Sequence, residues 1–147
     1  MKNLVIVFCL LPLSLFSQSN TVYATGGSIA FAHSLNLSYE HKLSGGTEIS
    51  GLYAKAMLGN IWTVNFFRDT DEDFTSRFNY MLGAGYLFGK GHNALELGLG
   101  FGNAADDEQS ISYLHACLGY RCQSTSMVFR TGLSFAEGLY LSYGFRF

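Results

Sequence analysis

The residues best suited to covalent chemistry are a histidine and a cysteine two positions apart, His115 and Cys117. Residues at that spacing lie on one face of a β-strand. The imidazole could therefore take the proton of the thiol, with an acid such as Glu137 to orient it. The same pattern fits two side chains that fill the interior of a sheet protein. We favour this second interpretation, because both residues fall on the polar face of their predicted strand, and we predict no catalytic residue.

Other ligand-type residues are scattered along the chain. The remaining histidines, His33, His41 and His92, are too far apart to suggest a metal site. Two acidic runs could bind Ca²⁺ or bridge phosphate groups through divalent cations, but neither has the ordered ligands and glycine of an EF-hand loop. We interpret them as solvated loops and predict no metal and no cofactor. The acidic residues concerned are Asp69, Asp71, Glu72, Asp73, Asp106, Asp107 and Glu108.

The composition argues against a water-soluble globular domain. Charged residues make up 14% of the 147 residues and aromatic residues 16%, with 17 glycines and one proline. A typical soluble domain has about 25% charged residues, because its surface must face water. The net charge of −2 is too small to suggest a nucleic-acid partner.

The first 19 residues have the pattern of a secretory signal. Lys2 is followed by an uncharged apolar run over 4–16 and by small polar residues at 17–19. The apolar run is too short to cross a bilayer as a helix. We predict cleavage near 17–19, which leaves residues 20–147 as one exported domain.

Apolar and polar residues alternate strictly through most of the mature chain, and this period of two is typical of strands whose faces meet different solvents. The pattern leaves open whether residues 20–43 form one long strand or two. The clearest segments are 94–102, 126–135 and 138–147, followed by 112–122, 77–88, 50–66, 35–40 and, more weakly, 21–31.

The two faces of these strands differ in kind. One carries leucines and aromatic residues, and the other carries Gly, Ser, Asn and a few ionisable groups. Because eight strands leave a lumen just wide enough for side chains, the glycines would balance large residues there. We predict an all-β fold: a closed antiparallel up-and-down transmembrane β-barrel of about eight strands, with a polar, Gly-rich lumen. The alternative is a soluble β-sandwich. The expected lumen charge network is Glu40, Lys55, Arg77, Glu96, His115, Arg121, Arg130 and Arg146.

The predicted connections alternate in length. Counting strands back from the C-terminus places both acidic connections, 68–73 and 103–109, at one end and the short turns 44–46, 89–92 and 123–124 at the other. Aromatic residues near both ends could form the girdles of a membrane barrel. They are Tyr39, Trp62, Phe66, Phe67, Phe88, Tyr120 and Phe147.

The C-terminal segment GLYLSYGFRF resembles the last strand of small bacterial outer-membrane β-barrels of the OmpA/OmpX-like size class. The resemblance implies an outer-membrane location in a Gram-negative cell and contact with outer-membrane lipid and lipopolysaccharide. The sequence does not fix the oligomeric state, for which we expect a monomer. The resemblance also implies recognition by the barrel assembly machinery. The residues that match this assembly signal are Leu139, Leu141, Tyr143, Phe145 and Phe147.

Such barrels include structural, adhesive and enzymatic members, so fold alone does not fix activity. His115, Cys117 and Glu137 loosely resemble the His, Ser and Glu of lipid A deacylase barrels, but a cysteine replaces the serine. We predict a non-enzymatic barrel with a structural or surface-interaction role. A lipid-modifying enzyme and a narrow, porin-like pore are the alternatives.

Overall fold

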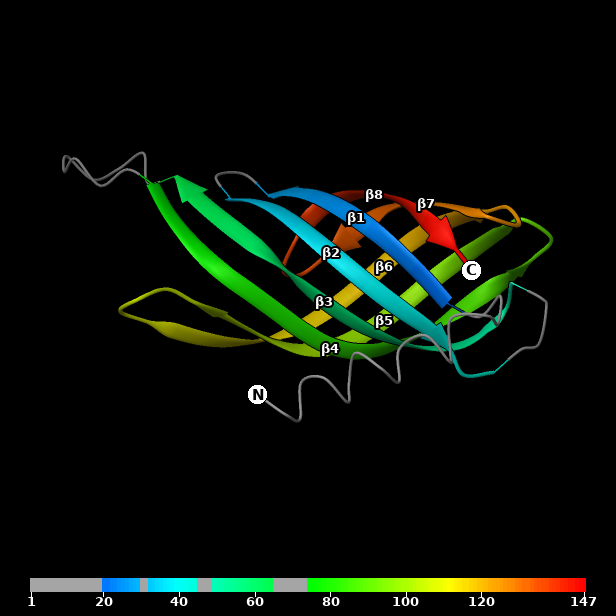
Figure 1. Ribbon diagram of the computed structural model, residues 1–147, viewed down its shortest axis with the longest axis horizontal. Coiled ribbons are helices and arrows are strands. Elements are labelled where there is room, and N and C mark those ends of the chain that lie inside the picture. Colours follow the sequence, from blue (N-terminus) through cyan, green and yellow to red (C-terminus); the bar gives the residue numbers. More distant parts are fainter. Residues whose placement is uncertain (1–19, 30–31, 45–48, 65–73) are drawn as a thin grey trace.

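The structure is a computed structural model that describes residues 20–29, 32–44, 49–64 and 74–147 (Figure 1). No helix in these ranges is long and apolar enough to cross a membrane. The strands are β1 (Asn20–Ile29), β2 (Ala32–Lys42), β3 (Gly51–Val64), β4 (Phe74–Lys90), β5 (Asn93–Ala105), β6 (Ser110–Gln123), β7 (Met127–Ser134) and β8 (Gly138–Arg146).

These strands form one closed barrel in which each pairs antiparallel with its neighbours in sequence. The barrel closes between β1 and β8, where Thr21 lies opposite Arg146 and Ser28 opposite Leu139. Two backbone hydrogen bonds extend this seam: the Asn20 N–H donates to the Phe147 carbonyl at 3.0 Å, and the Phe147 N–H donates to the Asn20 carbonyl at 2.9 Å. The predicted closed, antiparallel, up-and-down barrel is confirmed.

Residues 20–43, for which one strand or two were possible, form the two strands β1 and β2. Strands β4 and β5 are longer than predicted, because β4 begins at Phe74 and β5 continues to Ala105. Their extra residues include polar side chains on both faces, such as Thr75 and Ser76. Where both faces of a strand meet water, apolar and polar residues no longer alternate. The sequence pattern therefore predicts strands that are shorter than the observed ones.

The barrel has two distinct ends. The termini end holds the start of β1, the end of β8 and connections 43–50, 91–92 and 124–126, whereas the loop end holds connections 30–31, 65–73, 106–109 and 135–137. The described acidic turn, 106–109, falls at the loop end, as predicted, whereas the acidic run 68–73 lies outside the described residues. The predicted alternation of lengths is wrong, because the connection 43–50 at the termini end is longer than the connections 30–31, 106–109 and 135–137 at the loop end. Ile49 in this connection is only 2% exposed and packs in a buried apolar cluster with Tyr53, Leu87 and Ala94.

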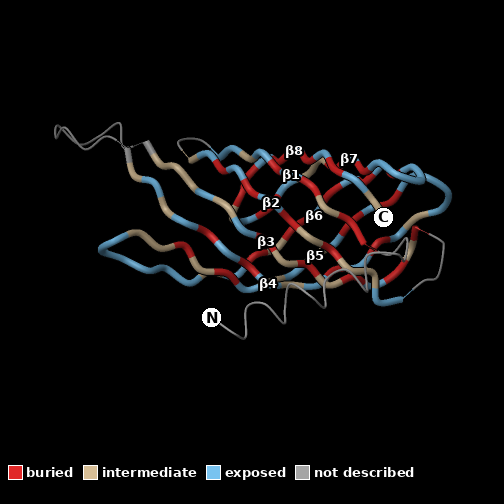
Figure 2. The backbone as a smooth tube through the Cα atoms, in the orientation of Figure 1, coloured by how far each residue is buried: buried red, intermediate tan, exposed pale blue. Residues whose placement is uncertain are grey.

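Buried and exposed residues alternate along the strands (Figure 2). In contrast to a soluble protein, the polar residues are the buried ones and the large apolar residues are exposed. On β8, Tyr140 and Ser142 are buried, whereas Leu139 and Leu141 are exposed. Leucines on the outer wall reach 69% exposure at Leu82. The barrel therefore has a polar interior and an apolar exterior.

Glycines make room for two tyrosines that reach across the lumen. A Cβ added to Gly85 would collide with the ring of Tyr53, and one added to Gly119 would collide with the hydroxyl of Tyr140. Both tyrosines are 2% exposed. The Gly-rich face thus lets large side chains fill a narrow lumen, which matches the physical reason given for the barrel prediction.

Two of the predicted girdle residues, Phe66 and Phe67, lie outside the described residues. Phe88 and Tyr120 are exposed on the outer wall near the termini end, at 50% and 46%. Tyr39, Trp62 and Phe147 are half-buried.

Candidate functional site

Four charged side chains meet inside the lumen, toward the termini end, and form what we call the ion quartet: Glu40 of β2, Glu96 of β5, Arg121 of β6 and Arg130 of β7. Arg121 forms an ion pair with Glu40, and Arg130 donates from Nε to Glu96 Oε2 at 2.8 Å. Two longer contacts link the two pairs: Arg121 Nε lies 3.8 Å from Glu96 Oε2, and Arg130 Nη1 lies 3.8 Å from Glu40 Oε1. Each side chain is at most 3% exposed, so the charges are compensated inside the barrel rather than by water.

Tyrosines surround the ion quartet. The Tyr23 hydroxyl donates to Glu40 at 2.5 Å, and the Tyr53 hydroxyl donates to Glu96 at 2.8 Å. The Arg130 guanidinium lies 4.2 Å from the Tyr23 ring centroid and 5.5 Å from that of Tyr140. These contacts satisfy carboxylate oxygens and place the arginine against aromatic faces, where cation–π attraction adds to the ion pairs.

The other residues expected in the lumen network lie apart from the quartet. Lys55 is buried with its Nζ 5.6 Å from the Tyr23 ring centroid. Arg77 lies at the loop end and donates to Asp106 at 2.8 Å. His115 is buried toward the loop end, and neither of its ring nitrogens has a hydrogen-bond partner in the described part of the chain. Arg146 is half-buried at the termini end.

A second polar cluster fills the lumen on the loop side of the quartet, around Glu137. Glu137 accepts from Asn36 at 2.9 Å and from Ser134 at 3.2 Å, and its own N–H donates to the Ser134 hydroxyl. Asn79 donates to Asn36 at 3.2 Å and accepts from the Tyr113 hydroxyl. Sequence reasoning did not place Glu137 in the lumen, because turn residues have no strand face to assign.

Glu137 changes the expected charge balance. The lumen charge network expected from the sequence contains two acids and five bases, so its expected net charge was positive. Among the described buried residues there are instead three acids and three bases, since Arg77 and Arg146 are not fully buried. The acids are Glu40, Glu96 and Glu137, and the bases are Lys55, Arg121 and Arg130. A balanced, packed interior is suited to a plug rather than to an ion path.

The geometry does not assemble a nucleophile and base from His115, Cys117 and Glu137. All three side chains are buried, at 2%, 7% and 2% exposure. The Cys117 thiol contacts Glu96 at 3.9 Å. Within the described residues no hydrogen bond joins His115 to Cys117 or to Glu137, whereas a nucleophile and its base must be within hydrogen-bond reach.

The Asp106 carboxylate stabilises the acidic turn of the β5–β6 hairpin by accepting hydrogen bonds. Its Oδ1 accepts from the N–H groups of Glu108 and Gln109 at 3.0 and 2.6 Å, and its Oδ2 accepts from Arg77. The hydrogen bond from Arg77, followed by the two from the backbone, lowers the pKa of Asp106 below its usual value. Both oxygens are therefore occupied. No group of metal-ligating residues is found in the described part of the chain.

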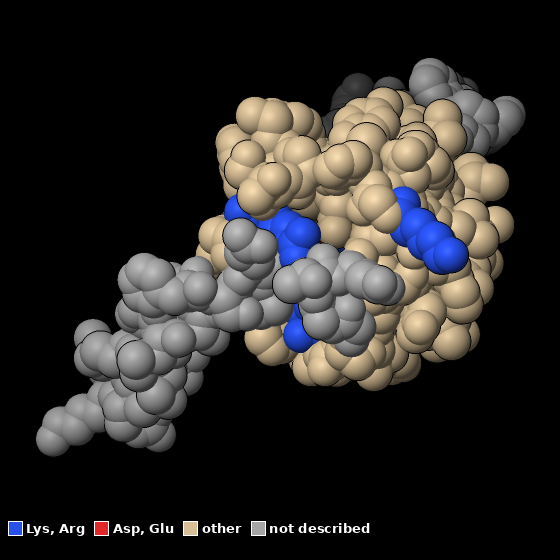
Figure 3. All heavy atoms as spheres, turned by 90° about the vertical axis from the view of Figure 1, so that its right-hand side faces the viewer, with Lys and Arg blue, Asp and Glu red and all other residues tan. Residues whose placement is uncertain are grey.

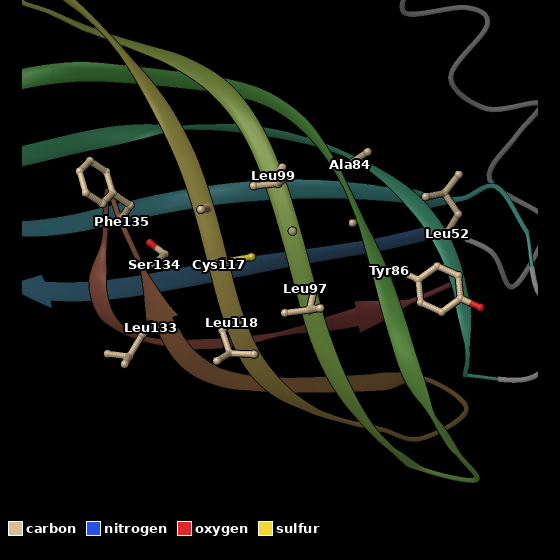
Figure 4. Close-up of a pocket in the computed structure, with 13 residues that line it drawn as sticks. Leu52, Ala84, Tyr86, Leu97, Leu99, Cys117, Leu118, Leu133, Ser134 and Phe135 are labelled. Atoms are coloured by element: carbon tan, nitrogen blue, oxygen red, sulfur yellow. The ribbon is translucent and has the colours of Figure 1, made fainter.

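The outer wall carries a groove of about 770 Å³ that runs across strands β3 to β7 (Figure 4). Leu97 and Leu118 project at its side, and the small residues Ala84 and Ala116 leave space between larger neighbours. No charged side chain lines it. The groove is an apolar hollow on the outside of the barrel, and it is far larger than the crevices of the lumen.

Comparisons with known proteins found one similar solved structure. No protein-family model and no curated protein matches the chain. Among solved structures, the chain is similar to the crystal structure of Ail, the attachment invasion locus protein of Yersinia pestis. The identity is 15%, the match covers 89% of this chain and 100% of that chain, and the TM-score is 0.46. The fold described above rests on the strand pairing of this chain and not on that similarity.

Proposed function

We propose that this chain is an integral protein of the bacterial outer membrane, held there by its outer wall. The observation that carries the proposal is the inverted distribution of side chains: glutamates and arginines are buried in the lumen, whereas Leu99, Leu133 and Leu139 are 62–65% exposed. In water, exposed apolar patches are rarely larger than a few hundred Å². Against acyl chains the same wall is favourable, and the closed barrel satisfies the backbone there.

The outer membrane is the location that best suits this barrel. The predicted secretory signal implies export, and the C-terminal strand ends in the alternating residues Tyr143, Phe145 and Phe147 of the predicted assembly signal. Tyr143 and Phe145 are exposed on the wall of β8, where an assembly partner could contact them. We propose that the assembly machinery recognises this strand and that the wall then contacts phospholipid and lipopolysaccharide chains.

Cell fractionation and gel mobility test the location together. The protein is expected in the outer-membrane fraction, to resist extraction by alkaline carbonate, and to migrate differently in boiled and unboiled samples on SDS gels. Recovery in the soluble periplasmic fraction, with identical migration of both samples, would overturn the proposal.

We propose further that the loop end binds other macromolecules at the cell surface. Strand β6 begins at Ser110, but its pairing with β7 begins only at Cys117. In Figure 1 the β3–β4 and β5–β6 hairpins extend beyond the other strands. Among the described residues, Ser110–His115 pair with β5 alone. This leaves a strand edge on which an extended peptide could be added by backbone hydrogen bonds.

The direction of the backbone groups on this edge follows from one hydrogen bond. The backbone carbonyl of Ala116 accepts from the Phe135 N–H, so the backbone groups of Ala116 point toward β7. By alternation, the backbone groups of Leu114 and Ser112 point the same way, toward the open side. Their side chains carry no charge that would repel a partner strand.

A displayed library of linear peptides, selected on the protein in nanodiscs, tests this surface. Bound peptides are expected to slow hydrogen exchange at the amides of Ser112 and Leu114, and Ser112→Pro is expected to abolish binding while the barrel stays heat-modifiable. Binding that survives Ser112→Pro, or amides already protected without peptide, would count against the edge as the docking site.

A further inference from the structure

The tip of the β5–β6 hairpin carries two carboxylates that take no part in holding the hairpin together. Asp107 and Glu108 are exposed, and within the described residues neither carboxylate forms a hydrogen bond or an ion pair. The third acid of the turn, Asp106, is occupied by Arg77 and by the turn backbone. The Asp106 N–H also donates to the Gln109 carbonyl at 2.9 Å, which closes the turn. Two negative charges are therefore held next to the open edge of β6.

The residues near this tip do not offset the two charges. Arg77 is the only lysine or arginine among the described residues of the loop end, and it is paired with Asp106. Residues 68–73 lie outside the described residues, but their sequence holds four carboxylates and one arginine, so they bring no net positive charge. Figure 3 looks onto the termini end, where the atoms drawn in colour include lysine and arginine in blue and no acidic residue in red. A cationic partner is therefore attracted to the loop end.

Beside the tip, the open edge of β6 offers two apolar side chains to a partner. Leu114 is 63% exposed on the outer face, and Ile111 is 46% exposed on the opposite face. The serine hydroxyls of this segment are already used. The Ser110 hydroxyl donates to Asn103 on β5 at 3.0 Å, and the Ser112 hydroxyl accepts from the same side chain at 3.2 Å. Side-chain contacts with a partner along this part of the edge are therefore mainly apolar.

The register of an added strand follows from the positions of these side chains. Strand β7 pairs antiparallel with β6 where the two strands meet, and a peptide that continues in line with β7 would do the same. If its first residue lies opposite Leu114, its fourth lies opposite Ile111, and its sixth and seventh lie beside Gln109 and Glu108. Cross-strand neighbours stabilise a sheet when both are apolar or when their charges are opposite.

We propose that the open edge of β6 binds extended peptides that are apolar at the first and fourth residues and basic at the sixth and seventh. Backbone hydrogen bonds with Ser112 and Leu114 hold the peptide. The apolar positions contact Leu114 and Ile111. The basic end lies beside the carboxylates of Asp107 and Glu108, where opposite charges attract. The partner is thus a cationic, extended segment of another protein. This inference rests on the proposed docking edge and adds its selectivity.

Three blocked heptapeptides test the selectivity. Each has valine at the first and fourth residues and threonine at the second, third and fifth. They differ only in the last two residues, which are lysine, glutamine or glutamate. The protein in nanodiscs of zwitterionic lipid, which carries no net charge to attract the peptides, is titrated with each of them, and the amide NMR signals of Ser112 and Leu114 are followed.

The lysine peptide is expected to bind most tightly and the glutamate peptide most weakly. At low ionic strength the lysine peptide should bind about three to ten times more tightly than the glutamine peptide, because each of two exposed ion pairs contributes modestly. This difference should shrink at high salt, where exposed charges are screened.

Matched variants locate the selectivity. Asp107→Asn/Glu108→Gln is expected to reduce the affinity of the lysine peptide to that of the glutamine peptide, while the affinity of the glutamine peptide stays unchanged. Lys90→Gln is the control, because it makes the net charge more negative at the opposite end of the barrel, where β4 ends. It is expected to leave all three affinities unchanged.

The outcomes separate this inference from the docking edge itself. If the three peptides shift the Ser112 and Leu114 signals with equal affinity, the edge binds peptides but the charge selectivity is refuted. If Lys90→Gln strengthens binding of the lysine peptide as much as the double variant weakens it, overall charge is responsible and the selectivity is again refuted. If no peptide shifts these signals, the docking edge and its selectivity are both refuted.

Discussion

Arg130 and Glu96 face each other across the lumen from strands β7 and β5, and the guanidinium donates to both carboxylate oxygens, one of them at 2.8 Å. Neither side chain is more than 1% exposed. The pair therefore joins two non-adjacent strands through the interior. Its energetic role follows from burial: each charge is tolerated because the other is present.

Removing one partner of this pair is predicted to destabilise the barrel more than removing both. Arg130→Met should lower the free energy of unfolding by about 3–5 kcal/mol, because it leaves Glu96 buried with less compensation. The double variant Arg130→Met/Glu96→Gln should cost less than either single change, because no uncompensated charge of the pair remains buried. Urea unfolding of barrels folded into lipid vesicles measures all three.

The control for this prediction is an ion pair at the surface. Arg77 and Asp106 form a pair at 2.8 Å, but their side chains are 26% and 19% exposed. Arg77→Met should cost at most about 1 kcal/mol. Equal losses for Arg77→Met and Arg130→Met would show that burial of the quartet does not matter to stability.

Gly119 is predicted to be needed for the fit of Tyr140. A methyl group at position 119 would meet the Tyr140 hydroxyl, so Gly119→Ala should destabilise the barrel by about 1–3 kcal/mol. Tyr140→Phe removes that oxygen and should restore part of the loss in the double variant. Thermal unfolding in detergent tests this, and an unchanged midpoint for Gly119→Ala would contradict the packing described here.

The β5–β6 turn is predicted to loosen in acid, with Arg77 setting the pH at which it does so. The Arg77 hydrogen bond keeps the pKa of Asp106 below its usual value. The stabilisation from the ionised carboxylate is therefore present at neutral pH, above the unfolded pKa of about 3.9. It is lost as the pH falls through the lowered folded pKa. Arg77→Gln should move the Asp106 titration to higher pH, as followed by the Glu108 and Gln109 amide signals in NMR.

The neighbouring carboxylate gives the control for this titration. Asp107 is exposed, and Asp107→Asn should leave the Asp106 midpoint nearly unchanged. If Arg77→Gln leaves that midpoint where it was, the hydrogen bond from Arg77 is not what lowers the pKa.

The cost of a charge on the outer wall is predicted to depend on its depth. Leu99 lies in the middle of β5, whereas Phe88 lies near the β4–β5 turn, and both are exposed. Leu99→Arg should destabilise the folded barrel in vesicles by about 2–4 kcal/mol, and Phe88→Arg by about 0–1 kcal/mol. Equal costs at the two positions would argue that no hydrocarbon layer surrounds the wall.

The barrel could be predicted from sequence because its faces alternate with so little noise. On β8, Leu139 to Phe145 alternate between apolar and polar or small residues, and the structure places them alternately outside and inside. The lumen positions of Glu40, Glu96, Arg121 and Arg130 follow from the same periodicity. What periodicity does not give is which of these residues meet, because that depends on barrel closure and on the stagger between strands.

The turns and the tyrosine contacts could not be predicted in the same way. Glu137 belongs to the β7–β8 turn, where period two has ended, and its burial depends on Asn36, 101 residues earlier. Tyr23 of β1 donates to Glu40 on the neighbouring strand β2, and Tyr53 of β3 donates to Glu96 on β5. The period of two places these side chains in the lumen but does not show which of them meet. The open edge of β6 likewise results from a difference in strand length that only the register shows.

Spin labels on barrels folded into lipid vesicles can show whether acyl chains contact the leucine face of the strands. With Cys117 and Cys122 replaced by serine, a label at Leu99→Cys should collide freely with dissolved oxygen and rarely with a water-soluble nickel complex. A label at Asp107→Cys, in the described turn at the loop end, should show the reverse. Equal access of the nickel complex to both labels would show that the wall faces water and that the barrel is not embedded in lipid.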